Sequence, residues 1–563
     1  MFRGKQRPIL LSALLGMVLV ATIGGLPNAG AETSTKRLSA ADQKLAEKQK
    51  ALLDPETALD PAASTDTGRT ALAKAGAQAR TEAATTASST ATLASSTGGH
   101  WASGTPLPAG FNSVHVVVGK GKVLLVAGSG NNQANFDAGS FKSYVCSARM
   151  DNCHLVPTPV DMFCAGHVLL PDGRALVGGG TLSYGAWKGA KYMYAFNFAT
   201  ETYDQLSPLE VGRWYPTMVT TIDGKTLITG GLDENGLLTT TTELFDYRTN
   251  SHTRLAGGHK FPMYPRIRLT SKLTYFFDGI GYGTTSDAPG FWDPFKNTFT
   301  PVSGLRYASR RSSGASCFVG DLRNQNLVVM GGGHPAVSAV DKIKLSDTSP
   351  KFVMGPTLRI PKVYLSCVTL PDGKLLEAGG GSNNTIAGAS YEVSTLNSIT
   401  SGWAAMNPIP AGNDRVYHSA LFVLDDGRVA SIGSNPSDGP PSSSVELFSP
   451  QYLYKGTRPA ITSIPCVIQR YSTISIGTSG GATRLTITKP PTPTHGSEPN
   501  EGYMSFPISG GKVNLSQGLG RYLPRGFYRA WVVNSAGAVS TAKWIYIREA
   551  GQTPPATAGG CCC

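Results

Sequence analysis

Short apolar runs that end at a glycine recur at a spacing of roughly fifty residues between His100 and Pro450. The seven runs are GKVLLVAGSG, DGRALVGGG, DGKTLITGG, KLTYFFDGIG, QNLVVMGGG, DGKLLEAGG and DGRVASIGS. Their length and glycine breaks predict β-strands, and several precede a second strand-like run such as TELFDYRTN, GFWDPFKNTF or VELFSPQYL. We therefore expect an all-β fold, with a seven-bladed kelch-type β-propeller over residues 101–457. A β-sandwich whose strands resemble one another by chance is the alternative.

The pattern changes after the last repeat. RPAITSIP, GATRLTITKP, GYMSFPI and FYRAWVVNSAGAVSTAKWIYI are short strand-like runs separated by polar turns. Together they favour an immunoglobulin-like β-sandwich over residues 458–548. The Pro/Gly-rich residues 549–563 are expected to form a flexible tail.

The first hundred residues divide into two parts. Residues 1–31, MFRGKQRPILLSALLGMVLVATIGGLPNAGA, combine a basic start, an apolar middle and a small-residue cleavage site. This order is typical of a secretory signal peptide, and an uncleaved anchor is the alternative. Residues 32–100 are expected to be an Ala/Thr/Ser-rich tether, largely disordered, with a short helix around AADQKLAEKQKALLD. We expect a secreted, extracellular protein with no integral membrane span after signal cleavage.

Composition narrows the function classes. With 66 Gly, 37 Pro and 15% charged residues, the chain of 563 residues fits a turn-rich β protein. The formal net charge of +13 suggests at most an affinity for anionic surfaces. Because no Lys/Arg cluster is interleaved with aromatic residues, we expect no nucleic-acid binding. We expect a monomer.

Export permits disulfides. Cys146 and Cys153 are close enough in sequence for a small loop bridge, and Cys317 and Cys367 fall in neighbouring repeats where they can pair. Cys466 has no evident partner, and the run CCC that ends the chain has no physical explanation in the sequence.

Reactive side chains recur at one position of the repeat, eight residues before an Asp-Gly turn. They are Cys164, Tyr215, Tyr364 and His418, and Tyr417 stands just ahead of His418. Because propeller blades radiate from one axis, the same position in each blade lies at the same height around that axis. We expect these side chains to face one another at the entrances of the innermost strands. Strict alternation of side chains is not required there, so Tyr417 and His418 can both turn toward the axis.

Each of these residues taken alone has a simpler explanation. A Cys within a strand is more often part of the core, and a Tyr-His pair more often packs and forms a hydrogen bond. Tyr364 fits a consensus feature of the blade better than a ligand. Taken together, imidazole and phenolate groups around one open site suit Cu(II), whereas zinc would recruit more Cys or His.

The chain resembles the copper radical oxidases, the family of galactose oxidase and glyoxal oxidase, over both the propeller and the C-terminal domain. The motifs that carry the resemblance are MFCAGH, GRWYPT, DRVYHS and PPTPTHGSEPNEG. In that family a Cys is joined through a thioether to a copper-binding Tyr of the next blade, which implies a Cys164–Tyr215 cofactor. Tyr417 and His418 match two further ligands, and His495 matches the last ligand, which a loop of the C-terminal domain supplies. The residues after His495 differ from the family's usual loop.

The resemblance implies copper and a Cys164–Tyr215 thioether radical as cofactors, with Cys164, Tyr215 and Tyr417 as the catalytic residues. It implies an oxidase that takes two electrons from small aldehydes or primary alcohols, including those on glycans, and reduces O2 to H2O2. GRWYPT looks more like the glyoxal oxidase branch, as does the lack of a folded carbohydrate-binding domain ahead of the propeller. One alternative is a copper-free kelch propeller that binds an envelope glycan or protein. The other is a propeller hydrolase, although Asp161 and Asp414 show no pairing by sequence.

Other chemically capable residues receive no catalytic role. Seven histidines lack the phase of the repeat and are expected to be structural or solvated: His100, His115, His154, His167, His252, His259 and His334. Trp214 is expected in the core or beside the site. Four arginines stand where they can line a polar mouth: Arg213, Arg266, Arg310 and Arg311.

Overall fold

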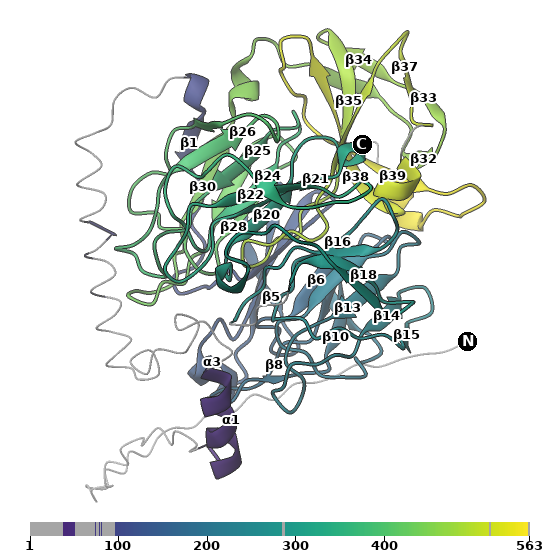
Figure 1. The fold of residues 1–563 in the computed structure, drawn as a ribbon. Coiled ribbons are helices and arrows are strands. Elements are labelled where there is room, and N and C mark those ends of the chain that lie inside the picture. Colours follow the sequence, from purple (N-terminus) through teal and green to yellow (C-terminus); the bar gives the residue numbers. More distant parts are fainter. Residues whose placement is uncertain are drawn as a thin grey trace, which may run out of the picture.

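A computed structural model describes residues 38–50, 74, 78, 80–81, 96–283, 288–516 and 519–560. Within these residues the strands form seven four-stranded antiparallel sheets, one five-stranded sheet and three two-stranded sheets. The four-stranded sheets, called blades below, surround a common centre (Figure 1). The predicted all-β propeller is therefore confirmed.

Each blade runs outward from the axis through four strands. The innermost strands are β2 (His115–Gly119), β6 (Gly166–Leu169), β12 (Thr217–Thr220), β16 (Ile267–Leu269), β20 (Ala315–Phe318), β24 (Ser366–Thr369) and β28 (Ala420–Val423). The second strands are β3 (Lys122–Gly128), β7 (Ala175–Gly178), β13 (Thr226–Thr229), β17 (Tyr275–Phe277), β21 (Asn326–Met330), β25 (Leu375–Ala378) and β29 (Val429–Ile432). The third strands are β4 (Lys142–Ser147), β10 (Met193–Asn197), β14 (Glu243–Asp246), β18 (Gly290–Asp293), β22 (Val340–Lys344), β26 (Val393–Leu396) and β30 (Val445–Ser449). The outer strands are β5 (His154–Pro157), β11 (Thr202–Gln205), β15 (Ser251–Arg254), β19 (Thr298–Pro301), β23 (Val353–Met354), β27 (Trp403–Ala405) and β1 (His100–Ser103).

Burial explains why the inner strands read as apolar runs. Every residue of β2, HVVVG, is buried, whereas most residues of the outer strand β11 are exposed. Strands covered on both faces favour β-branched residues such as the valines of β2. The Asp-Gly turns between the first two strands need glycine, because Gly173 and Gly427 have φ of +89° and +91°.

The N-terminal strand closes the ring. β1 pairs antiparallel with β30 and so completes the blade that starts at β28, more than three hundred residues later in the chain. The indole of Trp101 in β1 donates a hydrogen bond to the Asn407 carbonyl at 2.8 Å, and its ring lies 4.9 Å from Phe448. The strand is therefore fixed by side chains as well as by its backbone ladder.

The C-terminal strands form separate sheets. They are β31 (Ala460–Ser463), β32 (Val467–Gln469), β33 (Thr473–Ser475), β34 (Gly477–Ser479), β35 (Ala482–Thr488), β36 (Tyr503–Pro507), β37 (Lys512–Asn514), β38 (Gly526–Asn534) and β39 (Lys543–Arg548). The five-stranded sheet has the order β32-β39-β38-β35-β36, and only its β32–β39 pair is parallel. An immunoglobulin-like arrangement and the domain boundaries stay predictions.

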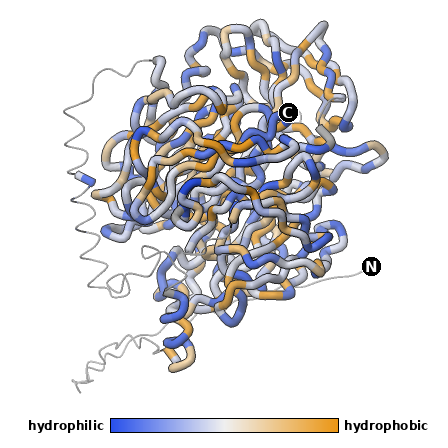
Figure 2. The backbone as a smooth tube through the Cα atoms, viewed as in Figure 1, coloured by the Kyte–Doolittle hydropathy of each residue, from blue (hydrophilic) through white to orange (hydrophobic). Residues whose placement is uncertain are grey.

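One hydrophobic cluster joins the C-terminal sheets to the propeller. It contains Phe276 and Phe318 from two blades together with Ile487 and Tyr528 from β35 and β38. Figure 2 shows hydrophobic segments running along the strands of both parts, with hydrophilic segments in many of the connecting loops. The C-terminal sheets are thus fixed on one end of the propeller (Figure 1), which lets a loop between β35 and β36 reach the axis.

Both expected disulfides form. Cys146 pairs with Cys153, and Cys317 pairs with Cys367, which joins the innermost strands β20 and β24 of neighbouring blades. Cys466 is also disulfide-bonded, to a partner outside the described residues. Cys466 thus has a partner, although none was evident from the sequence.

The helices whose bounds the structure describes are few and short. They are α1 (Ala40–Lys50), α3 (Gln133–Asp137), α4 (Leu519–Tyr522) and the 3-10 turns η2 (Ser96–Gly98), η3 (Ala308–Arg310), η4 (Leu322–Asn324), η5 (Gln451–Tyr454) and η6 (Ala556–Gly560). Helix α1 forms where the sequence predicts one in the tether. The expected signal peptide and most of the tether lie outside the described residues. No described helix is long and apolar enough to cross a membrane.

Trp101→Ala tests the closure of the ring. We expect it to lower the free energy of unfolding by about 3 kcal/mol, because the indole loses its packing on Phe448 and its hydrogen bond. Met354→Ala, in the exposed strand β23, is the matched control and should change stability by about 0.5 kcal/mol or less. Denaturant unfolding measures both, and equal effects of the two variants would contradict the role given to β1.

Candidate metal centre

A left-handed backbone turn opens the innermost strand in six of the blades. Its φ lies between +41° and +65° at Cys164, Tyr215, Tyr264, Ser313, Tyr364 and His418. Residues other than glycine rarely adopt this conformation. Backbone hydrogen bonds join successive turns: the Tyr215 N–H donates to the Cys164 carbonyl at 2.9 Å, and the Tyr264 N–H donates to the Tyr215 carbonyl at 2.8 Å. The blades therefore hold these side chains in a ring around the axis.

The same turn lets two adjacent residues enter the site. His418 has φ of +63°, so Tyr417 and His418 do not point to opposite faces as they would in a strand. Their rings lie 3.8 Å apart with an interplanar angle of 27°. The backbone of Tyr417 is fixed by Asn384, whose side-chain oxygen accepts from its N–H at 3.2 Å, and by Asn435, whose N–H donates to its carbonyl at 2.6 Å.

The structure brings together all five residues that the sequence singles out. The hydroxyls of Tyr215 and Tyr417 are in direct hydrogen-bond contact. The ring of His495 lies 5.0 Å from Tyr215, 5.3 Å from Tyr417 and 4.6 Å from His418. The Cys164 sulfur and one nitrogen from each histidine lie within 4.8 Å of one another. All five side chains are buried.

His495 reaches the axis on the loop between β35 and β36. The loop is braced at its base, where the Thr492 N–H and hydroxyl donate to the carboxylate of Glu498. At its tip, the guanidinium of Arg266 and the hydroxyl of Tyr282 each donate to the His495 carbonyl at 3.1 Å. The loop is therefore fixed by propeller residues as well as by its own stem.

The Nε2 atoms of His418 and His495 have no hydrogen-bond partner among the residues that the structure describes. Nδ1 of His495 contacts the Thr494 hydroxyl at 2.6 Å, and Nδ1 of His418 contacts the Asn112 amide at 3.0 Å. Nε2 of each ring is buried and has no partner within the described part of the chain. A buried nitrogen without a partner is costly, and coordination of a metal removes that cost. Two imidazole nitrogens beside two phenol oxygens fit copper(II).

Burial keeps the site uncharged in the absence of a metal. It raises the pKa of the Cys164 thiol and the Tyr215 phenol well above their ordinary values. Burial likewise lowers the pKa of His418 to about 3 and that of His495 well below its ordinary value. Neutral imidazoles are the form that binds metal, and a bound cation would favour the phenolate form of the tyrosines.

Sequence reasoning missed several aromatic residues of the same cluster. Tyr264 lies 4.4 Å from Tyr215, and Trp187 stacks on Trp214 at 4.5 Å. Tyr264 occupies the repeated position, but Lys272-Leu273 stands eight residues after it where the aligned repeats have an Asp-Gly turn. Trp187 lies on a loop between strands, where the repeat leaves no pattern. Trp214, expected in the core or beside the site, lies 4.2 Å from Tyr215 and is both.

Three of the four arginines do not line a polar mouth, and the side chain of Arg310 lies outside the part that the structure describes. Arg213, Arg266 and Arg311 are at most 1% exposed. Arg213 pairs with Glu243 at 3.0 Å, and Arg311 pairs with Asp341 at 2.8 Å. The guanidinium groups of Arg213 and Arg311 are thus neutralised within their blades, because a buried guanidinium needs a carboxylate partner.

Two of the histidines expected to be structural or solvated lie next to the candidate site. Nδ1 of His115 contacts the Thr494 hydroxyl at 2.9 Å, and the His115 ring lies 6.0 Å from His495. His167 is 5.0 Å from His115, ring to ring. Both are buried, so neither is solvated, and His115 helps to orient the hydroxyl that contacts His495.

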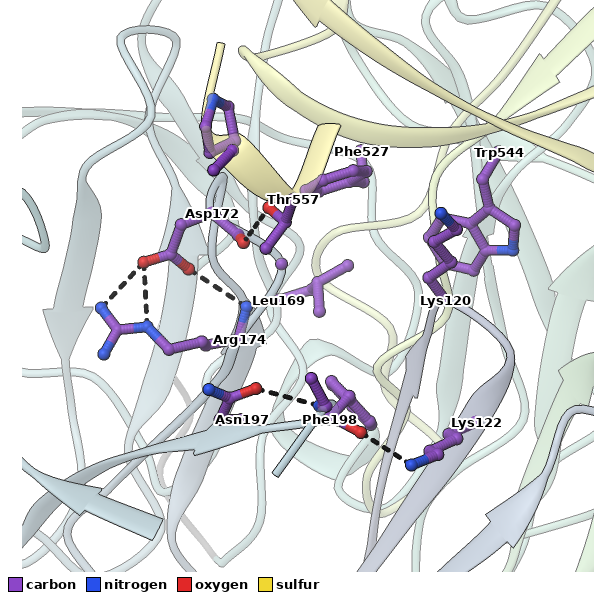
Figure 3. A pocket seen from close by; sticks show the side chains of 14 residues that line it. Lys120, Lys122, Leu169, Asp172, Arg174, Asn197, Phe198, Phe527, Trp544 and Thr557 are labelled. Atoms are coloured by element: carbon purple, nitrogen blue, oxygen red, sulfur yellow. Dashed lines mark hydrogen bonds and ion pairs between the residues drawn. The ribbon is translucent and has the colours of Figure 1, made fainter. Parts of the chain in front are cut away.

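A separate cavity of about 580 Å³ lies between the propeller and the C-terminal sheet (Figure 3). Phe527 and Trp544 line one side, and Asp172 and Arg174 line another. Asp172 and Arg174 pair with each other at 2.8 Å, and the Trp544 indole donates to Asp425 at 2.8 Å. None of the lining residues belongs to the tyrosine–histidine cluster.

Comparisons with known proteins agree with the geometry. The chain is 24% identical over 442 residues to the aldehyde oxidase GLOX of Vitis pseudoreticulata, an alignment that covers 69% of this chain and 82% of that protein. It is 23% identical over 444 residues to galactose oxidase of Gibberella zeae, covering 70% of this chain and 62% of that protein. No protein-family model matches the chain.

A solved structure shares the fold. A fungal alcohol oxidase of the AA5 family, in complex with copper, superposes with a TM-score of 0.68 at 20% identity. The superposition covers 80% of this chain and 99% of that one. These relatives support the copper radical oxidase family that the sequence motifs resemble.

His418→Gln tests the burial of a neutral imidazole. The unfolded chain binds this proton near pH 6.5, whereas the folded chain binds it only near pH 3. The contribution of His418 to stability is thus complete above pH 6.5 and is lost by about 1.4 kcal/mol per unit as the pH falls toward 3.

The measurement is urea unfolding of metal-free wild type and His418→Gln at pH 6.5 and 4.5. The difference between the two proteins cancels the titration of the carboxyl groups. We expect the variant to lose less stability than wild type over this interval. Equal losses would contradict a neutral, desolvated His418.

Proposed function

We infer that this chain is a copper radical oxidase, a secreted enzyme that oxidises an aldehyde or a primary alcohol and reduces O2 to H2O2. Its aldehyde oxidase and galactose oxidase relatives support the class of copper-dependent oxidases. The observation that carries the proposal is the meeting of two phenols, two imidazoles and a thiol at one buried point, where neither imidazole Nε2 atom has a hydrogen-bond partner among the described residues. The signal-like N-terminus supports secretion.

A thioether between Cys164 and Tyr215 is the proposed redox cofactor. The two side chains share one hydrophobic cluster, and the Cys164 thiol lies within hydrogen-bonding reach of the Tyr215 side chain. Formation of the C–S bond removes one hydrogen from the thiol and one from the ring. The two electrons and two protons pass to O2, which becomes H2O2. Sulfur on the ring lowers the energy of the Tyr215 radical.

Four side chains are proposed to hold copper: the phenols of Tyr215 and Tyr417 and the Nε2 atoms of His418 and His495. Copper bound there would supply one of the two oxidising equivalents and a position for the substrate oxygen. The Thr494 hydroxyl accepts from Nδ1–H of His495, which leaves the lone pair of Nε2 for the metal.

The protein residues carry the proton and hydrogen transfers. Tyr417 takes the hydroxyl proton of the alcohol, or of the aldehyde hydrate, as general base. The Tyr215 radical then takes the hydrogen atom from the adjacent carbon, and an aldehyde or acid forms once the remaining electron leaves, for which bound copper would supply the oxidising equivalent. O2 accepts the two electrons and two protons, which restores the resting enzyme and releases H2O2.

The proposed substrates are small aldehydes or primary alcohols, including those on glycans. The relative from Vitis pseudoreticulata is named an aldehyde oxidase and the solved neighbour an alcohol oxidase, which supports both classes. Burial also favours a small reacting group, because Tyr417 is only 4% exposed and Tyr215 only 2%. A terminal CHO or CH2OH reaches such a site more easily than a secondary alcohol.

The alternatives are less well supported. A hydrolase would need a carboxylate free to act, but Asp161 accepts hydrogen bonds from the N–H groups of Ser129 and Phe163, and Asp414 accepts from Arg80 and Ser434. A copper-free binding module gives no reason for the buried Nε2 atoms of His418 and His495 to lie beside two phenols with no hydrogen-bond partner among the described residues.

Intact mass of the copper-incubated protein tests the thioether. We expect a loss of two hydrogens relative to the metal-free protein, confined on peptide mapping to a cross-link between Cys164 and Tyr215 that survives reductant. Peroxide release is then screened with small aldehydes and primary alcohols. Neither a mass loss nor peroxide with any substrate would favour the binding module.

Cys164→Ala separates metal binding from redox chemistry. The variant should keep copper, because its four proposed ligands remain, and should lose most of the oxidase rate, by about a hundredfold or more. Copper stoichiometry and initial rates measure the two effects. A wild-type rate in this variant would exclude the radical role of the sulfur.

A further inference from the structure

The N-terminal helix α1 docks on the end of the propeller opposite the C-terminal sheets (Figure 1). It lies against the loop of blade residues that contains the short strands β8 (Thr181–Ser183) and β9 (Lys188–Gly189). Asp42 pairs with Lys188 at 2.7 Å, but both side chains are about a quarter to a third exposed, so this ion pair adds little. The docking must depend on other contacts.

Gln49, near the end of α1, makes those contacts. Its side-chain oxygen accepts from the Trp187 N–H at 2.8 Å. Its amide nitrogen donates to the Trp187 carbonyl at 2.8 Å and to the Gly236 carbonyl at 2.9 Å. Gln49 is 1% exposed, so these three hydrogen bonds are shielded from water. The Gln49 side chain thus fixes both the N–H and the carbonyl of Trp187, and its bond to Gly236 links two neighbouring blades.

The partner loop is shaped to admit this amide. Gly236 has φ of +76°, and a Cβ placed there would lie 2.5 Å from the Gln49 amide nitrogen and 2.9 Å from Leu45. Gly185 has φ of +86°, and a Cβ there would lie 2.8 Å from Leu38. Each glycine therefore allows close contact by α1 or the residues before it, which any other residue would obstruct.

The residue that Gln49 pins belongs to the metal centre's aromatic wall. The Trp187 ring stacks on Trp214 at 4.5 Å with an interplanar angle of 10°, and Trp214 lies 4.2 Å from Tyr215. The indole nitrogen of Trp214 is buried and has no hydrogen-bond partner within the described residues. No hydrogen bond orients the Trp214 ring, so packing against Trp187 has to do so.

A second contact fastens the N-terminal segment on the other side of the site. Arg80 Nε pairs with Asp414 at 2.7 Å, and its Nη2 donates to the Pro440 carbonyl at 3.0 Å. The Asp414 side chain is fully buried and stands three residues before Tyr417. The segment therefore contacts loops that flank both tyrosines, and removal of residues 1–31 would leave these contacts in place.

We propose that Gln49 is a positioning residue for the Tyr215 radical: it fixes Trp187 so that Trp187 and Trp214 stack beside Tyr215, and α1 is thereby a working part of the metal centre. The stack excludes water from the Tyr215 ring and offers it a polarisable neighbour, which stabilises the radical without touching copper or substrate. The role of the radical rests on the function proposed above, whereas the stack and its fixation by Gln49 do not.

Gln49→Ala in the full-length protein tests the proposal. We expect kcat to fall by about tenfold, with copper affinity unchanged and KM changed by less than about twofold, because the variant alters the surroundings of Tyr215 and none of the ligands. The near-ultraviolet circular dichroism of the stacked indoles should also diminish. Gln43→Ala, on the exposed face of the same helix, is the matched control and should match wild type in every measurement.

Trp187→Phe completes the test. If Gln49 acts through Trp187, Gln49→Ala should add little further loss of kcat in the Trp187→Phe background. Additive losses, or a Gln49→Ala variant with the kcat and dichroism of wild type, would overturn the proposal. A wild-type protein without oxidase activity would refute the proposed function alone, because the dichroism of the indole stack still reports whether Gln49 orders it.

Discussion

The candidate metal centre depends on a left-handed turn at the entrance of six of the seven innermost strands. A strand alternates its side chains between two faces, so a strand alone cannot deliver Tyr417 and His418 to one point. The turn at His418, with φ of +63°, removes that restriction. The same type of turn occurs at Cys164 and Tyr215, which lie in neighbouring blades. Backbone hydrogen bonds from one turn to the next hold the conformation against its cost. The left-handed residue before the innermost strand thus recurs around the axis, and it brings a thiol, phenols and an imidazole close together.

Removal from water determines the protonation state of the thiol, phenol and imidazole groups in the candidate site. These side chains are buried beside the C-terminal loop and within a cluster of aromatic residues, so thiol, phenol and imidazole are all held in their neutral forms. A cation that enters this environment finds neutral imidazoles and phenols that can lose their protons to it. The Thr494 hydroxyl donates to the Val114 carbonyl and so accepts from Nδ1–H of His495, which leaves the Nε2 lone pair of His495 for such a cation. Structure and electrostatics therefore favour the same chemistry.

The repeat made much of this predictable. Strand length, glycine breaks and Asp-Gly turns predicted the propeller, and the common spacing predicted that Cys164 and Tyr215 would share a height on the axis. Tyr264 was missed because Lys272-Leu273 replaces the Asp-Gly turn between the first two strands of its blade, and Trp187 was missed because it lies in a loop outside the repeat. Gln49 could not have been found, because a polar residue in a low-complexity tether carries no sign of the backbone it binds. The prediction that Arg213 lines a polar mouth was wrong for a related reason. The sequence does not indicate that Glu243 is its buried partner.

The central claim is that these side chains meet on one copper ion, and electron paramagnetic resonance of the copper-loaded protein tests it most directly. The account predicts one Cu(II) per chain with hyperfine coupling to two imidazole nitrogens, and the loss of one nitrogen coupling in His495→Gln. A spectrum without nitrogen coupling, or one that His495→Gln leaves unchanged, would contradict it.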